Sequence, residues 1–547
     1  MKDYDKQGEE TLLNPNPQYD TIIIGAGLSG LTCGALLSRA GMKVAVLEMD
    51  AKPGGYLAGF ERKGFRFDSS IHWLNQCGEN GLVTRVFNAI DADHPKAFPQ
   101  RNIRKTVTDS TSYLLADNPD ELRDSLIERF PHEKEGILRF FKDVRKIAEG
   151  FSDYGSSFRS MQTRGFFEKP YYGMKMAKFG LTFVPHAFYN GEEGLKKGLR
   201  KYFTDPELHK FWSAESDLLS CLIPIAWAYN KDFQLPPTGG GQVIADWLSD
   251  SIVKSGGEIF CNTKVEKIIH EGKKAVSVIA HNKGEELKFD SRFIVAASDV
   301  ETLYEKIMDV RLSDAEFLKK LRNAELYSSA VTVSIGLDCS AESLGFNDEL
   351  IMISKEDVLR TDHICGDPQK SDISVMSPSA RDKSMAPDGK GTLTIYCPAY
   401  YSDFSTLSKD EYVKFKNDFA HILINRVEKA LSENIRSHIE FMDVATPVTY
   451  HRYTGNREGV MMGARPGKVN FKARIAHFVT PLENVFLCGH WSALGGGVPI
   501  AVSTAANVAL MVLKNDGNRF FKPLGKYFDG SVSVQEFNKC LARSENS

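Results

Sequence analysis

The sequence predicts an α/β protein whose main sheet is assembled from segments far apart in the chain. Three observations support this. An apolar, β-branched run at residues 20–24 leads through a glycine-rich turn into an apolar helix. A second apolar run follows at residues 43–47, as in a β-α-β unit. Further strand and glycine blocks return after residues 235 and 484, so we expect two interleaved domains in a chain of 547 residues.

The first unit is a strand over residues 20–24, a helical stretch after Gly30 (LTCGALLSRAG) with a terminating Gly41, and a second strand over residues 43–47. Both strands are short and continuously apolar, as expected for buried parallel strands. The turn between the first strand and the helix carries the G-x-G-x-x-G pattern that ends at Gly30.

Each glycine of the pattern has a physical role. The first allows a tight turn, the second lets backbone approach a pyrophosphate, and the third lets the helix pack on the strand. The diphosphate then meets unpaired N–H groups at the positive end of the helix dipole. Glu48 lies 18 residues after Gly30, where its carboxylate can accept hydrogen bonds from ribose hydroxyls. The unit predicts dinucleotide binding, rather than a glycine-rich turn without a ligand, through Gly25, Gly27, Leu28, Ser29, Gly30, Glu48 and Met49.

A glycine doublet, Gly54-Gly55, begins six residues after Glu48, in the stretch KPGGYLAGFERKGFRFDSSIHWL. This stretch resembles the flavin amine-oxidase and polyene-desaturase superfamily, in which the doublet contacts the diphosphate of FAD. The segment Phe67–His72 is similar to the phenylalanine-aspartate-x-glycine segment that runs beneath the flavin ring, with serine where the family often has glycine. The resemblance implies FAD contacts at Gly54, Gly55, Tyr56, Ser70, Ile71 and His72.

Two later blocks extend the resemblance. PPTGGGQ at residues 236–242 precedes an amphipathic helix and strands near residues 258–268 and 293–297, and the family's adenine contact falls on the backbone of Val265. A strand at residues 484–489 precedes a GGGVP turn that opens a helix of small residues. That helix start would stabilise negative charge at the flavin pyrimidine edge. The implied contacts are Gly489, His490, Gly497 and Val498.

Within the superfamily, the chain is similar to the group of carotenoid desaturases, carotenoid isomerases and retinol saturases. PPTGGGQ, SVMSPSARDKSMAPDGKGTLTIYCPA and TPVTYHRYTGNREGVMMGARPG carry this similarity, which covers most of residues 18–515. One position departs from the family, because His490 stands where an acid usually follows Gly489. If His490 faces the diphosphate, that negative charge should raise the pKa of the imidazole; otherwise the side chain points away.

The predicted architecture is a discontinuous Rossmann-like FAD-binding domain with an inserted α+β substrate domain. The FAD domain comprises residues 18–90, 235–300 and 440–515, and the substrate domain comprises residues 91–234 and 301–439. A disordered lead-in (1–17) precedes them, and a C-terminal extension (516–547) follows.

His72 is the one titratable residue expected beside the isoalloxazine, either as the general acid that protonates carbon or as a structural histidine. Cys488 lies inside a predicted buried strand, so we expect it to pack there and the FAD to be non-covalent. No second G-x-G-x-x-G follows a later strand. Electrons therefore have to pass to or from a partner that docks transiently.

The substrate domain contains two segments that allow more than one interpretation. One combines aromatic and basic residues and is either a membrane-facing entrance for an apolar substrate or a solvated amphipathic layer. It holds Phe166, Phe167, Lys169, Tyr171, Tyr172, Lys175, Lys178, Phe179, Phe183, His186 and Phe188. The other, residues 212–229, is an apolar helix broken by Pro224, which lines a substrate tunnel or belongs to the core.

Composition excludes several classes of protein. A formal net charge of −3 gives no footprint for nucleic acid. Nine cysteines without a CxxC pair argue against a disulfide framework or a zinc site, and we expect no metal and a cytoplasmic location. No run of 18 or more apolar residues predicts a membrane-spanning helix, which leaves peripheral membrane association open.

The sequence therefore predicts an FAD-dependent oxidoreductase acting on carbon–carbon bonds of a long apolar polyene or isoprenoid. Saturation, desaturation and isomerisation all fit this prediction. A flavin amine oxidase is the second enzyme hypothesis, and an FAD-stabilised lipid-binding protein is the non-enzyme alternative.

Overall fold

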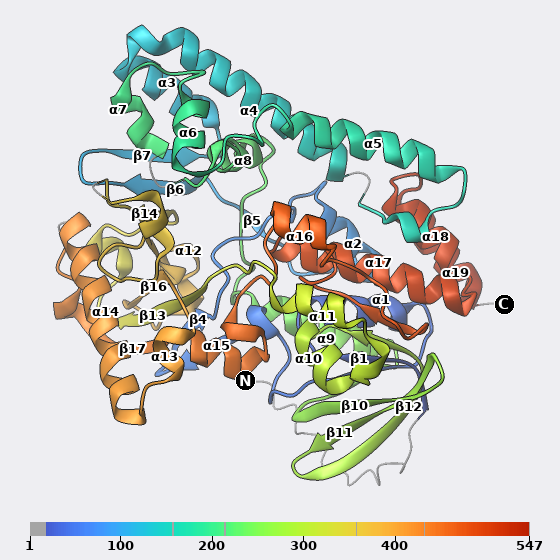
Figure 1. Ribbon diagram of the computed structural model, residues 1–547. Helices are drawn as coiled ribbons and strands as arrows, with labels where there is room; N and C mark the ends of the chain where they lie inside the picture. Colours follow the sequence, from blue (N-terminus) through green and yellow to red (C-terminus); the bar gives the residue numbers. More distant parts are fainter. Residues whose placement is uncertain (1–17, 156–157, 213–214, 357, 432, 546–547) are drawn as a thin grey trace.

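The computed structural model describes residues 18–155, 158–212, 215–356, 358–431 and 433–545, so the lead-in predicted at residues 1–17 lies outside the described residues. Two sheets lie side by side, and a layer of helices crosses above them (Figure 1). The α/β prediction is confirmed.

The first sheet has five parallel strands in the order β18-β12-β1-β2-β9, and β11 and β10 continue it antiparallel from β12. All of β2 and most of β1 is buried, as the apolar runs predict. The strands are β1 (Gln18–Ile24), β2 (Val44–Leu47), β9 (Glu258–Phe260), β10 (Thr263–Glu271), β11 (Lys274–Asn282), β12 (Glu285–Ala296) and β18 (Val485–Leu487).

Strand β12 is much longer than the 293–297 run predicted from sequence. Its first half pairs antiparallel with β11, and its second half lies between β1 and β18. The first half is half-solvated and alternates polar with apolar residues, so no continuous apolar run marks it. Helix α1 ends at Arg39 with Ala40 as its C-cap, and the following Gly41 has a φ of +81°, as expected for the glycine that terminates the helix.

Helices α1 (Leu28–Arg39), α9 (Gln242–Lys254) and α17 (Val498–Asp516) cover one face of this sheet and share a core with α2 (Leu82–Ile90). The other face packs against α10 (Val300–Thr302), the following turn and α11 (Ala315–Arg322). The C-terminal helices α18 (Phe521–Phe528) and α19 (Val534–Glu545) add Phe528 and Phe537 to the first core.

The second sheet has the order β17-β13-β16-β15-β14-β6-β7, with every pair antiparallel except β14 with β6. Every residue of β13 is buried, and the strand shares a hydrophobic core with α14 (Lys409–Leu431). The strands are β6 (Asn102–Val107), β7 (Ser112–Ala116), β13 (Ser329–Leu337), β14 (Leu350–Ile353), β15 (Ile373–Met376), β16 (Gly391–Ala399) and β17 (Ile439–Ala445).

The domain boundaries remain predictions, with two visible differences in packing. Strand β17 crosses the boundary predicted between residues 439 and 440, because it pairs with β13 in the second sheet. The segment from Leu303 to Leu321 packs on the first sheet, although the sequence places it in the substrate domain.

Several short strands and helices complete the two sheets and their surroundings. They are β3 (Gly59–Arg62), β4 (Phe65–Asp68), β5 (Phe98–Pro99), β8 (Gln234–Leu235), α12 (Pro378–Arg381), α13 (Ser402–Ser405), α15 (Pro447–Thr454) and α16 (Lys468–Ala473).

The helical layer contains α3 (Pro119–Arg129), α4 (Lys134–Gly155), α5 (Glu168–Phe183), α6 (Gly191–Leu199), α7 (Pro206–His209) and α8 (Leu218–Tyr229) (Figure 1). The sequence predicts that Pro224 breaks the apolar helix, but α8 continues through Pro224 without interruption. The side chain of Asp217 caps the start of α8.

Among the described residues, α17 is long and apolar enough to cross a membrane. Most of it is buried against α1 inside the first core, as in the core helix of a globular domain.

Candidate dinucleotide site

The glycine loop after β1 is closed by direct backbone contacts. Gly25 has a φ of +101°, and its N–H donates to the carbonyl of Leu47 at 2.8 Å. A Cβ on Gly30 would lie 2.0 Å from the carbonyl oxygen of Gly25, so only glycine fits there. A Cβ on Gly27 would meet nothing within 4 Å. The loop is therefore tight on the helix side and open at Gly27, where the sequence places the diphosphate.

The glycine doublet lies directly against this loop. Gly54 donates to the carbonyl of Ala26 at 2.9 Å and forms an isolated bridge with Gly27. A Cβ on Gly55 would lie 3.1 Å from the Cα of Gly27. Both doublet residues have positive φ, +139° and +54°. Two glycine motifs separated in sequence thus form one backbone-lined surface.

Glu48 directly follows the last residue of β2 beside the same loop and is buried. Its carboxylate accepts hydrogen bonds from the backbone N–H of Ala26 at 2.7 Å and of Asp50 at 2.9 Å. Burial raises the pKa of Glu48, and these hydrogen bonds oppose that shift. Each carboxylate oxygen keeps a second lone pair, which can accept from a ribose hydroxyl.

The predicted adenine contact lies next to Glu48. Thr263 donates its N–H to the carbonyl of Glu48 at 2.7 Å, which places β10 and the buried Val265 at the end of β2. Met49 is more exposed, with 37% of its surface accessible.

The serine at the family's glycine position has a hydrogen-bonding role here. The Ser70 hydroxyl donates to the carbonyl of Tyr56 at 3.0 Å, so it ties the predicted flavin segment to the doublet. The Tyr450 hydroxyl donates to the carbonyl of Ser69 at 3.0 Å, and that of Tyr56 to the carbonyl of Val460 at 2.7 Å. The hydroxyls of Ser70, Tyr56 and Tyr450 thus join the segments around residues 56, 70, 450 and 460.

The C-terminal block closes the cleft. Gly489, with a φ of +99°, donates to the hydroxyl of Thr504 at 3.0 Å, and a Cβ added to it would lie 3.3 Å from the Ser29 hydroxyl. Gly497 caps α17 as Gly27 caps α1, and neither helix start has a side-chain cap. Their first N–H groups therefore remain available to an anion. Val498 is buried behind Gly497.

Cys488 is buried in the first core, and burial raises the pKa of its thiol far above the ordinary value. A neutral, packed thiol is a poor nucleophile, which supports the expectation of a non-covalent cofactor.

His490 lies next to Gly463, since its Cβ would be 3.3 Å from a Cβ added to that glycine, and its side chain is partly buried. In the protein alone, burial lowers the pKa of His490 to about 4. Its contact with the diphosphate, which would raise this pKa, remains a prediction. Desolvation penalises the imidazolium, so the side chain is neutral at physiological pH.

His72 is also neutral. Burial, and secondarily the Arg381 guanidinium, lowers the pKa of its imidazole to about 4. Its ring meets Tyr396 edge to face at 5.1 Å, and its buried Nδ1 has no hydrogen-bond partner among the described residues. The role of His72 as a general acid remains a prediction, and the lowered pKa of its imidazole favours the other interpretation, a neutral structural histidine. His72 remains a predicted cofactor contact.

Sequence reasoning missed the residues that surround His72. Arg381 donates to the carbonyl of His72, and Tyr396 comes from the second sheet. Asp68 accepts from the N–H of Gly241 at 2.7 Å, which joins the FDSS and PPTGGG segments, and burial raises its pKa to about 6. Arg381 and Tyr396 lie in segments quoted only for family similarity, and no local pattern marks them.

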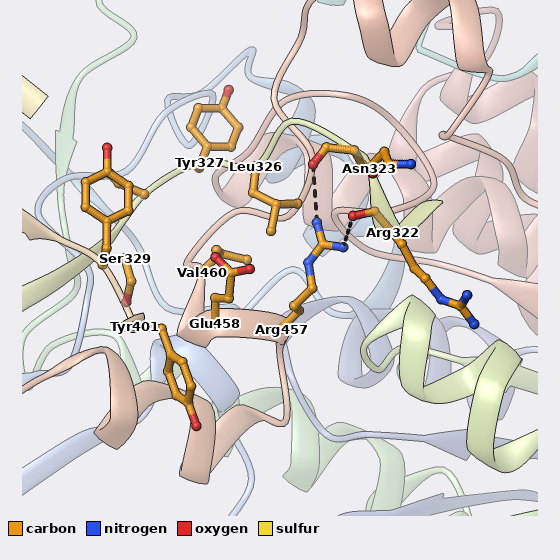
Figure 2. Close-up of a pocket in the computed structure, with 12 residues that line it drawn as sticks. Arg322, Asn323, Leu326, Tyr327, Ser329, Tyr401, Arg457, Glu458 and Val460 are labelled. Carbon is orange, nitrogen blue, oxygen red and sulfur yellow. Dashed lines mark hydrogen bonds between the residues drawn. The ribbon is translucent and has the colours of Figure 1, made fainter. Parts of the chain in front are cut away.

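A separate cavity of about 390 Å³ is lined by residues from three segments, around residues 322–329, 400–401 and 457–460 (Figure 2). Arg457 does not offer its charge to this cavity, since its guanidinium donates to the carbonyls of Arg322 and Ala324 and pairs with Glu301. Glu458 lines the cavity with a φ of +56°. This cavity contains none of the residues predicted to contact the dinucleotide.

The described residues fit an FAD. An open glycine, a backbone-lined doublet, two helix starts without side-chain caps and an acid at a strand end meet at the carboxyl edge of the parallel sheet. This is the edge where open α/β sheets bind nucleotides.

Comparison with known proteins agrees with this geometry. The model of a family described as flavin containing amine oxidoreductase matches residues 28–513. The chain is 28% identical to the chloroplastic prolycopene isomerase of Daucus carota, over 92% of this chain and 81% of that protein. It is 25% identical to the all-trans-retinol 13,14-reductase of Danio rerio, over 88% and 84%. The 4,4'-diapolycopen-4-al dehydrogenase of Metabacillus indicus is 23% identical, over 91% and 97%.

Solved structures share the fold. An oxidoreductase from Methanosarcina mazei superimposes with a TM-score of 0.55 at 17% identity, covering 90% of this chain and all of the other. A putrescine oxidase variant superimposes with a TM-score of 0.58 at 13% identity, covering 92% of this chain and all of the other.

Gly30→Ala should reduce FAD affinity at least tenfold, because its Cβ would collide with the carbonyl of Gly25 and displace the loop. Flavin per chain, measured by absorbance after gel filtration, checks this. Gly173→Ala, where a Cβ meets nothing within 4 Å, is the matched control. Full flavin occupancy in Gly30→Ala would show that the cofactor does not depend on this loop.

Acid should destabilise the protein through His72 and His490, whose pKa values fall from 6.5 to about 4 on folding. Between these values the unfolded chain binds more protons, so stability is lost as the pH falls from 6.5 towards 4. Urea unfolding at several pH values checks this. His490→Asn should flatten the dependence, and His421→Asn on the exposed side of α14 is the control. An equal pH slope in wild type and His490→Asn would contradict the assignment.

Proposed function

The chain belongs to the flavin-containing amine oxidoreductase family, whose cofactor is FAD, and we propose that it acts on carbon–carbon bonds of a long apolar polyene or isoprenoid. The observation that carries this proposal is similarity along nearly the whole chain to three enzymes named for polyene substrates. The reaction is a saturation, desaturation or isomerisation, and electrons pass to or from a transient partner.

The walls beside His72 support an apolar substrate. Trp73 and Phe233 pack against each other with ring centroids 5.9 Å apart, and Tyr396 meets the His72 ring edge to face. A cavity of about 250 Å³ next to them is lined largely by Ile71, Pro236, Pro237, Met376, Pro378 and Met385. Such a lining excludes water and orients a hydrocarbon chain by shape.

The charges beside this cavity do not select between an amine and a polyene, because Asp68, Arg381 and Asp382 all line it. The amine alternative is therefore decided by the test below. The likeness to putrescine oxidase is one of fold alone, at 13% identity.

In this proposal, bound FAD supplies two-electron exchange with carbon, and the protein supplies binding, dryness and electrostatics. The glycine loop, the doublet and Glu48 hold the dinucleotide. The start of α17 stabilises negative charge near the ring. His72 contributes packing through its edge-to-face contact with Tyr396, and its role as general acid remains a prediction.

The test mixes the protein, anaerobically reduced with dithionite, with a conjugated polyene such as all-trans-retinol or a poly-cis-carotene. We expect a saturated or isomerised product by chromatography. In a separate assay the oxidised, aerated protein should release no hydrogen peroxide with putrescine or cyclohexylamine. Peroxide with an amine would replace the proposal with an amine oxidase. A flavin that no donor reduces would favour a lipid-binding protein.

We also propose that α5 forms a peripheral membrane contact. Its inner face packs on α4 through Phe179 and Phe183, which contact Phe151. Its outer face is strongly exposed: Phe166 and Phe167, just before the helix, are 82% and 91% accessible and Phe188 just after it is 80% accessible. Tyr171, Met174 and Leu181 extend this apolar surface.

The composition of this surface supports lipid as its partner. Lysines 169, 175 and 178 interleave with the exposed aromatics, and this pattern suits anionic head groups above an apolar boundary. Helices α4 and α5 run along the edge of the molecule, away from both sheets (Figure 1). Tyr172, Phe179, Phe183 and His186 are turned inward, so only some of the predicted stretch belongs to this surface.

The protein should sediment with vesicles of phosphatidylcholine and phosphatidylserine, more at low salt because surface charges are screened within about 8–10 Å at physiological salt. The double variant Phe166→Ser/Phe167→Ser should lose most of this binding. Phe471→Ser, which replaces a phenylalanine that is 64% accessible elsewhere, is the matched control. Equal sedimentation of the three proteins would leave α5 as a solvated helix.

A further inference from the structure

The apolar cavity beside His72 has a polar end that a pure hydrocarbon would leave unsatisfied. Arg381 and Asp68 both line this cavity of about 250 Å³, together with the prolines and methionines of the remaining wall. Arg381 has a structural role, since it donates to the carbonyls of Asp348 and His72, but these bonds do not use all of its donors, and a buried charge is costly unless it is paired.

The hydrogen bonds of Arg381 leave one nitrogen without a partner. Its Nε donates to the carbonyl of Asp348 at 2.9 Å, and its Nη1 donates to the carbonyl of His72 and contacts the sulfur of Met376. Its Nη2 is buried and has no hydrogen-bond partner among the described residues. Burial lowers the pKa of Arg381 to about 10, although the charges of Asp348 and Asp68 oppose the shift.

Asp68 supplies an acceptor at the same end. One of its carboxylate oxygens accepts from the N–H of Gly241, which leaves the other free of any hydrogen bond to described residues. The neighbouring Asp382 is already engaged, since its oxygens accept from the N–H groups of Gly239 and Ser384. The end of the cavity therefore offers one strong donor and one acceptor.

This pair favours a neutral oxygen over an anion. Arginine can only donate hydrogen bonds, so it needs a carbonyl or hydroxyl oxygen. A hydroxyl can accept from Arg381 and donate to Asp68, whereas a carboxylate would meet the negative charge of Asp68 and Asp382.

We propose that this cavity receives the oxygen-bearing end of the substrate, so that the enzyme acts on a polyene or isoprenoid with a terminal alcohol or aldehyde in preference to the hydrocarbon. This inference rests on the proposed function and deepens it by naming the end group. Arg381 is then a specificity-determining residue, and the neighbouring His72 segment positions the polyene next to the cofactor site.

The test measures binding of matched ligands to the FAD-loaded protein. The ligands are all-trans-retinol, retinal, and the hydrocarbon with the same polyene chain, and quenching of protein fluorescence gives each Kd. Wild type should bind the alcohol and aldehyde about tenfold to a hundredfold more tightly than the hydrocarbon, as one hydrogen bond to a buried charged group predicts.

Arg381→Met should bring that ratio close to one while keeping hydrocarbon affinity, and Arg381→Lys should restore some of it. Met385→Leu, a volume-conserving change in the same wall, should change all the affinities by one common factor. Flavin content and melting temperature establish that each variant is folded. The ratio of alcohol to hydrocarbon affinity in the wild-type protein tests the proposal without any variant.

The outcomes separate the two proposals. Hydrocarbon and alcohol bound equally by wild type, or an unchanged ratio in a folded Arg381→Met, would overturn the end-group assignment while the polyene proposal stands. Failure of every polyene to bind or react would overturn both.

Discussion

The close approach of backbone at the carboxyl end of β1 is the constraint on which the rest of the site depends. Gly25 turns with positive φ, Gly30 lies against its carbonyl, and Gly54 bonds to Ala26. Because no side chain fits between these segments, α1 begins immediately beside the strand end. Its N-terminal amides, the doublet and Glu48 therefore share one small region, and Gly27, where an added Cβ would meet nothing within 4 Å, is its open point.

Two buried polar atoms without hydrogen-bond partners among the described residues lie close together, since His72 Nδ1 and Arg381 Nη2 belong to residues joined by a hydrogen bond. Asp68, which lines the same cavity as Arg381, has a pKa raised by burial. Unpaired buried polar groups cost free energy, so their position beside a cavity is typical of a ligand site.

The apolar features of the molecule lie at two separate places with different consequences. Inside, the prolines and methionines around residues 236 and 376 form a dry wall near His72. Outside, α5 presents aromatic side chains to solvent at a cost that a lipid surface would remove. An enzyme that takes an apolar substrate from a membrane needs both a surface that contacts lipid and an apolar cavity that takes the place of the lipid around the substrate.

The sequence by itself determined the local units. The 20–48 β-α-β unit, the doublet, the PPTGGG block and the C-terminal glycine helix all follow from short patterns, because turns, strand ends and glycine φ angles depend on nearby residues. Tertiary structure alone decided which distant groups meet. The second half of β12 lies between β1 and β18, Ser70 bonds to Tyr56, and Arg381 reaches the carbonyl of His72 across 309 residues. The pKa directions of His72 and His490 belong to this class, because desolvation depends on the packing of several segments. No local sequence pattern encodes the packing of distant segments around each histidine.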